Sequence, residues 1–148
     1  MNNMDIKKLM VGDWVWCGSN YGQVAETFNF QGELLITVNN RRNKYFEEIN
    51  PFEVTTDEKD VRPIPLTEEF FEKNGIKKVD YYCLRPNVLF ESEDKRIRIT
   101  DLTNNGDGYW NVHIDNEDYD TIGVCDVKYV HQFQQFLRLC GYEMNVII

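Results

Sequence analysis

Lysine and arginine are missing from one long stretch of the chain, since neither occurs between Arg98 and Lys128. The 148 residues carry a formal net charge of −9, and residues 99–148 contribute −6 of it through eight carboxylates against two basic side chains. An acidic surface repels polyanions on average. The charge balance therefore disfavours nucleic acid and anionic membranes as the main partners, although it leaves room for a local basic patch.

Long apolar runs are missing as well. No segment approaches the roughly 20 consecutive apolar residues needed to span a bilayer. The first residues contain neither an uninterrupted apolar core nor the small-residue cleavage site of a signal peptide. The 4 cysteines lie far apart and form no C-x-x-C pair, so reduced, buried thiols are expected. These absences predict a cytoplasmic protein.

Aromatic residues, by contrast, are abundant, with 9 Phe, 8 Tyr and 3 Trp. This content predicts a packed core. Short β-rich segments at 13–17, 23–28 and 33–38, separated by turns, predict a small β lobe over residues 1–54. Residues 55–66 are charged, carry two prolines and predict an extended connector. Residues 67–148 predict a second, α+β lobe, with both lobes sharing one core.

The second lobe is predicted to open with a short helix. Thr67 is a suitable N-cap, Glu68 and Glu69 follow in the first turn, and Gly75 is placed to end the helix in a left-handed conformation. Alternating patterns over 95–100, 109–114 and 119–125 then predict an antiparallel meander with one buried face. In the last of these segments, Ile122 and Val124 supply the apolar face.

A longer amphipathic helix is predicted to close the lobe. Asp126 is the expected N-cap and Gly141 the expected stop. An apolar stripe at helical spacing is expected to pack on the meander, with His131 on the opposite, polar face. The apolar residues 144–148 predict a tail that is held down, as an edge strand or in an oligomer contact. The whole chain is predicted to be α+β.

The residues that could bind a metal ion or act in catalysis do not form a convincing site. A zinc site from His113, Cys125, His131 and Cys140 matches no known ligand spacing. A catalytic pair of Cys125 and His131 has no recognisable oxyanion hole or orienting third residue. The segment 101–108, DLTNNGDG, imitates half of a calcium loop but lacks the glutamate that completes one. We therefore expect no catalytic residue, metal or cofactor, and predict that the protein is not an enzyme.

The best candidates for binding are aromatic and basic. Trp14 and Trp16 share one face of the first strand, and a basic hairpin follows at residues 41–45. The predicted partner-binding surface, for a protein partner, comprises Trp16, Tyr21, Arg41, Arg42, Lys44 and Tyr45.

Several alternatives stay open. The basic hairpin favours nucleic acid as a second class of partner. The acidic run within 115–126 suits a mimic of a polyanion, a divalent-ion site or a solvated rim. An enzyme whose site forms only on oligomerisation, a homodimer included, is a further alternative.

Two resemblances add to this interpretation. The segment GDWVWCGSNYGQV at 12–24 resembles the opening of SH3-like small barrels of the KOW and Tudor type, which implies such a barrel for the first lobe. The combination of GDWV, PIPLTEEFFEKNGIKK at 63–78 and VKYVHQFQQFLRLCGYE at 127–143 resembles a family of short bacterial proteins, some of them carried by phages. That family carries no established activity, so the resemblance implies an architecture and a phage or mobile-element origin.

Overall fold

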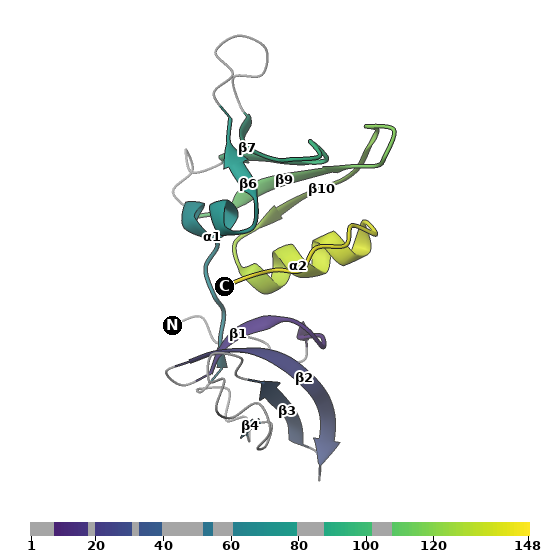
Figure 1. Ribbon diagram of the computed structural model, residues 1–148. Coiled ribbons are helices and arrows are strands. Elements are labelled where there is room, and N and C mark those ends of the chain that lie inside the picture. Colours follow the sequence, from purple (N-terminus) through teal and green to yellow (C-terminus); the bar gives the residue numbers. More distant parts are fainter. Residues whose placement is uncertain are drawn as a thin grey trace. The chain divides into compact units, whose positions relative to one another are not determined.

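The chain divides into two compact units, Met1–Ile64 and Pro65–Ile148. The computed structural model describes residues 8–17, 20–30, 33–39, 52–54, 61–79, 88–101 and 108–148. Each unit contains one antiparallel sheet, and the second also contains both helices (Figure 1). The predicted α+β class is thereby confirmed. Neither helix in the described ranges is long and apolar enough to cross a membrane.

The first unit is a sheet in the order β4-β3-β2-β1-β5. No pairing joins the outer strands within the described part of this unit, so the predicted closed barrel is not seen there. One strand lies inside the segment predicted as a connector, because its two residues pair with β1. The five strands are β1 (Trp14–Cys17), β2 (Asn20–Phe30), β3 (Glu33–Asn39), β4 (Phe52–Val54) and β5 (Val61–Arg62).

The two faces of the first sheet differ in composition. Val15, Val24 and Val61 are almost completely buried. Val15 lies opposite Gly22 in the β1–β2 register, and side chains alternate between faces along a strand, so the immediate neighbours of Val15 point to the other face. Trp14 and Trp16 therefore share the second face, as predicted. Trp14 is buried, whereas Trp16 is half-buried.

The second unit contains a meander in the order β10-β9-β8-β7-β6, with antiparallel pairing throughout. The predicted antiparallel meander is confirmed, and two of its strands, β6 and β7, were not predicted. The strand predicted at 79–84 lies almost entirely outside the described residues. Strands β6 and β10 form the two edges of this sheet. The strands are β6 (Ile76–Lys78), β7 (Val88–Ser92), β8 (Ile97–Asp101), β9 (Trp110–Asp115) and β10 (Thr121–Val127).

The short helix α1 (Glu68–Lys73) begins and ends as predicted. The Thr67 side chain accepts a hydrogen bond from the Phe70 amide at 3.2 Å, which satisfies one of the unpaired donors at the helix start. Gly75 follows the helix with a φ of +74°. That left-handed conformation favours glycine and turns the chain into β6.

The long helix α2 (Val130–Leu139) differs from its prediction at its start. Asp126 lies in β10 and is not the N-cap, because that strand continues to Val127. The Gln132 side chain instead accepts hydrogen bonds from the amides of Lys128 and Tyr129, at 3.0 and 3.2 Å. The predicted stop is confirmed, since Gly141 has a φ of +67° and the helix ends before it.

The buried part of α2 is wider than its apolar stripe. The stripe itself is buried as predicted, but His131 is only 8% exposed, so its predicted place on a polar face is wrong. Helical spacing predicted the apolar centre of the buried region, and the polar residues His131 and Gln134 beside it are buried as well. The buried residues of the helix are Val130, His131, Phe133, Gln134, Phe136 and Leu137.

Phe71 of α1 stands at the centre of the second core. Its ring centroid lies 5.2 Å from that of Trp110, 5.5 Å from Phe90 and 6.0 Å from Phe133. These four rings come from α1, β7, β9 and α2, so one side chain connects both helices to the sheet. The Trp110 indole donates a buried hydrogen bond to the Leu66 carbonyl oxygen at 3.3 Å.

The sheet of the second unit buries one face and leaves the other polar. Ile97 and Ile99 are fully buried, as their alternation predicted. On β10, however, Ile122 and Val124 are exposed, so their predicted place on the buried face is wrong. The face of β10 toward α2 is formed by Gly123 instead, because a Cβ atom there would lie 2.6 Å from the Cys140 sulfur.

The C-terminal tail is held by a side chain and not by a strand. The Asn74 amide nitrogen donates to the Ile147 carbonyl oxygen at 2.8 Å, and the Ile147 amide donates back to the Asn74 oxygen at 2.7 Å. No strand is present in residues 141–148. The prediction of a fixed tail is confirmed, and its form as an edge strand is wrong.

Candidate functional site

An aromatic pair lies on the second face of the first sheet. Trp16 of β1 is directly opposite Tyr21 of β2 in the antiparallel register. Their ring centroids are 3.9 Å apart with an interplanar angle of 40°. Both side chains are half-buried. Contact between the rings fixes both rotamers, and the remaining exposed edges form a rigid apolar surface.

A basic residue stands beside this pair. Trp16 is also opposite Arg62 of β5, so one cross-strand row runs from Arg62 through Trp16 to Tyr21. Side chains directly opposite in antiparallel strands lie on the same face. Arg62 is exposed. The prediction from sequence missed Arg62, because residues 61–62 were taken for a connector and only the pairing with β1 places it here.

Of the six residues predicted to bind a partner, the structure brings two together. Trp16 and Tyr21 are in contact. Arg41, Arg42, Lys44 and Tyr45 lie outside the described residues, as does most of the calcium-loop imitation at 102–107. Their part in the site stays a prediction.

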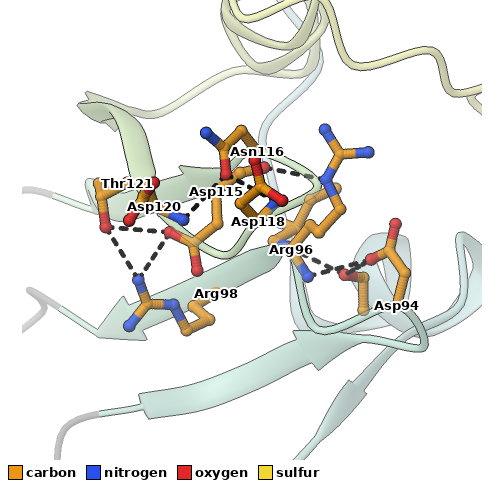
Figure 2. A network of polar contacts seen from close by, with 10 residues as sticks. Asp94, Arg96, Arg98, Asp115, Asn116, Asp118, Asp120 and Thr121 are labelled. Carbon is orange, nitrogen blue, oxygen red and sulfur yellow. Dashed lines mark hydrogen bonds and ion pairs between the residues drawn. The ribbon is translucent and has the colours of Figure 1, made fainter.

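The acidic run of the second unit is partly built into the fold. Figure 2 shows Arg98 of β8 and Arg96, directly before that strand, converging on Asp115 at the end of β9. Arg98 pairs with the Asp115 carboxylate at 2.9 Å, and Arg96 donates to the Asp115 carbonyl oxygen at 2.9 Å. Thr121 donates to the same carboxylate oxygen at 2.9 Å. Asp115 therefore stabilises the β9–β10 hairpin, and its carboxylate already accepts hydrogen bonds from Arg98 and Thr121.

The loop that follows is held by one side chain. The Asn116 side-chain oxygen accepts hydrogen bonds from the amides of Asp118 and Asp120, both at 2.9 Å (Figure 2). The carboxylates of Glu117, Asp118 and Asp120 belong to exposed residues. Within the described ranges, no three His, Cys, Asp or Glu side chains are grouped closely enough to hold a metal ion.

A second polar cluster surrounds Asp94 in the β7–β8 turn. The Ser92 hydroxyl donates a hydrogen bond to the Asp94 carboxylate at 2.6 Å. The Tyr142 hydroxyl donates a second hydrogen bond to the same carboxylate at 2.7 Å. The Arg96 guanidinium lies 4.9 Å from the centre of the Tyr142 ring. Partial burial by itself would raise the pKa of Asp94, but the hydrogen bonds from Ser92, Tyr142 and the Arg96 amide together lower it. Burial and the bond to Asp94 raise the pKa of Tyr142 to about 12.

The residues considered for zinc or nucleophilic chemistry do not act together. His113 lies opposite Val124 and Arg98 on the polar face of the sheet, where burial and the Arg98 charge lower its pKa. Burial and the Asp126 charge raise the pKa of Cys125. Burial and the neighbouring Cys125 raise the pKa of Cys140. Both thiols are therefore protonated at neutral pH, the opposite of an activated nucleophile.

A groove of about 680 Å³ runs between the end of α2 and the tail after it. Its walls mix apolar side chains such as Leu137 and Val146 with the exposed Arg138 and Glu143. The opposite charges on its rim select neither an anion nor a cation, so we assign it no ligand.

Comparison with family models, curated proteins and solved structures found no match for this chain.

Proposed function

We propose that the protein is a non-enzymatic binding module that recognises a protein partner through its first sheet. One observation carries this proposal: the half-exposed pair of Trp16 and Tyr21, with centroids 3.9 Å apart, stands in one row with Arg62. Tryptophan, tyrosine and arginine are the residues that most often dominate the energy of protein interfaces. The basic hairpin predicted at 41–45 lies outside the described residues, and its share in this surface is part of the proposal.

The proposal includes an SH3-like organisation of the first unit. Two observations support it. The last strand, β5, returns to pair with the first strand, β1, and the long strand β2 has a bulge between Val24 and Glu26. Such a bulge lets one strand bend and contribute to two sides of a small barrel. The resemblance to short bacterial and phage-carried proteins belongs to the same proposal.

A binding role is preferred to catalysis because the polar groups of the two clusters described above are engaged with one another. Asp94 and Tyr142 share a hydrogen bond, and Asp115 accepts hydrogen bonds from Arg98 and Thr121. Active sites need such groups to converge on a space for substrate. The described residues offer no such arrangement.

Affinity capture from a host lysate, with and without nuclease, tests the proposal. We expect a stoichiometric protein partner that survives nuclease, is lost with Trp16→Ala and is reduced at least tenfold with Arg62→Glu. Leu139→Ala, which removes an exposed apolar side chain at the end of α2 in the second unit, is the control and retains the partner. Because Arg62 is exposed, its variant separates lost binding from lost folding. A partner that binds all three variants equally would refute this surface, and recovery that depends on nucleic acid would favour the basic hairpin.

A further inference from the structure

The two edges of the second sheet differ in length and in protection. Edge strands expose unpaired backbone groups, and proteins commonly guard them with lysine, proline or a short strand. Strand β6 has three residues, of which Lys77 and Lys78 are exposed lysines. Strand β10 has seven residues and contains no lysine, arginine or proline. Within the described residues, β6 is therefore the guarded edge, and β10, which has only a bulge at its start, is the open edge.

The open edge also exposes apolar side chains. Ile122 is 47% exposed and Val124 is 53% exposed, both on β10. Tyr119, directly before the strand, is 63% exposed. A bulge between Thr121 and Gly123 interrupts the pairing at the start of the strand, so its regular part runs from Gly123 to Val127. That part is long enough to pair with an added strand of about five residues.

The exposed charges at the two ends of this edge are carboxylates, whereas the nearby Arg98, which also contacts Thr121, is paired with Asp115. Asp120 precedes the strand, Asp126 lies near its end, and both are exposed. The first basic residue after the strand, Lys128, lies over the Tyr109 ring, with its Nζ 5.4 Å from the ring centre. A second copy of the chain would bring the same carboxylates together across the new pairing. Charge complementarity therefore points to a basic partner and against self-association.

We propose that β10 is a docking edge for an extended basic peptide segment of another protein, which adds to the sheet as a sixth strand. Backbone hydrogen bonds supply affinity in this mode of recognition, and alternate side chains supply specificity. In the regular part of β10, the exposed face presents Val124 and Asp126, and Ile122 lies at the bulge just before it. The matching strand carries a β-branched residue opposite Val124 and lysine or arginine near the carboxylates of Asp126 and Asp120. This site is separate from the aromatic pair of the first unit.

The test uses a fluorescent peptide, Lys-Thr-Val-Thr-Val-Thr-Lys, and the full chain. We expect saturable binding that slows hydrogen exchange at the amides of Gly123 to Val127. Replacing both terminal lysines of the probe by glutamate weakens binding at least tenfold. Val124→Lys in the protein does the same, because it places a guarding charge on the edge.

The matched control is Ile147→Lys, which adds the same charge at a similarly exposed apolar residue of the same unit and changes the affinity less than twofold. Equal losses in the two variants would overturn the proposal, since net charge would then explain the binding. Protection outside β10 would overturn it too, as would a wild-type dimer in sedimentation that Val124→Lys dissociates. Trp16→Ala is expected to leave this peptide bound, which separates the test from that of the aromatic pair.

Discussion

Tyr142 and Asp94 show how a single hydrogen bond sets two acidities in opposite directions. The hydroxyl donates to the carboxylate at 2.7 Å. Burial, together with this bond, raises the pKa of Tyr142 to about 12. Burial acts to raise the pKa of Asp94 as well, but donation from Ser92 and Tyr142 favours the charged carboxylate, and its pKa is lowered.

Tyr142→Phe is expected to raise the pKa of Asp94 toward 3.8, its ordinary value. In the wild type, the unfolded carboxyl protonates near that value and the folded carboxyl only at lower pH. Its stabilising contribution is therefore complete above the unfolded pKa and disappears as the pH falls through the folded pKa. NMR titration of the Asp94 carboxyl carbon measures the change. Tyr119→Phe is the control, and an unchanged Asp94 titration in Tyr142→Phe would contradict the assignment.

At the scale of elements, the contact between β10 and α2 depends on a residue without a side chain. A Cβ atom at Gly123 would lie 2.6 Å from the Cys140 sulfur and 3.0 Å from the Phe136 ring. Real contacts of this kind are essentially never so short. The closeness of strand and helix therefore requires glycine at this position.

Gly123→Ala is expected to lower the free energy of unfolding by about 1–3 kcal/mol, the usual effect of overpacking. Chemical denaturation followed by circular dichroism measures it. Adding Cys140→Ala removes the nearer clash and is expected to restore part of the loss, while the Phe136 contact remains. Gly75→Ala offers a comparison, since its strain comes from a φ of +74° with no atom within 4 Å of the added carbon. A Gly123→Ala variant as stable as the wild type would show that the helix shifts freely.

Local sequence signals predicted the position of a helix or strand better than they predicted which of its faces is buried. Helix α1 was predictable because Thr67 and Gly75 are cap signals that act within a few residues. The start of α2 was not, because Asp126 is an equally good residue for a strand edge and pairing with β9 decided between the two. Ile122 and Val124 were assigned to the wrong face for a similar reason. Alternation separates two faces, but only the helix packed on the sheet determines which one is buried.

The candidate site was predictable in part. The faces of Trp14 and Trp16 follow from strand periodicity alone. Arg62 joins Trp16 only through pairing between segments far apart in the chain, and no local pattern reports such pairing.

At the scale of the whole molecule, each unit contains buried side chains of its own. Val15, Val24 and Val61 are buried in the first unit, and the rings around Phe71 in the second. The three tryptophans are divided between them, with Trp14 and Trp16 in the first and Trp110 in the second. Each unit thus contains its own spectroscopic reporter.

Phe71→Ala is expected to destabilise the second unit by about 3–5 kcal/mol, because a large buried ring leaves a cavity. With fluorine-labelled tryptophan, the Trp110 resonance should reach its unfolding midpoint at lower denaturant concentration than in the wild type. The Trp14 and Trp16 midpoints should move much less. Val24→Ala is the reciprocal control in the first unit. Identical shifts at all three tryptophans would mean that the chain unfolds as one cooperative body.

The unequal edges of the second sheet also determine at how many edges it can accept a further strand. Polymers grow through sheets only when each subunit offers two free edges, one to accept a strand and one to present a strand. In the described part of this sheet, Lys77 and Lys78 guard β6, and β10 is the open edge. A strand that docks on β10 therefore extends the sheet from one side, and the lysines of β6 oppose growth from the other.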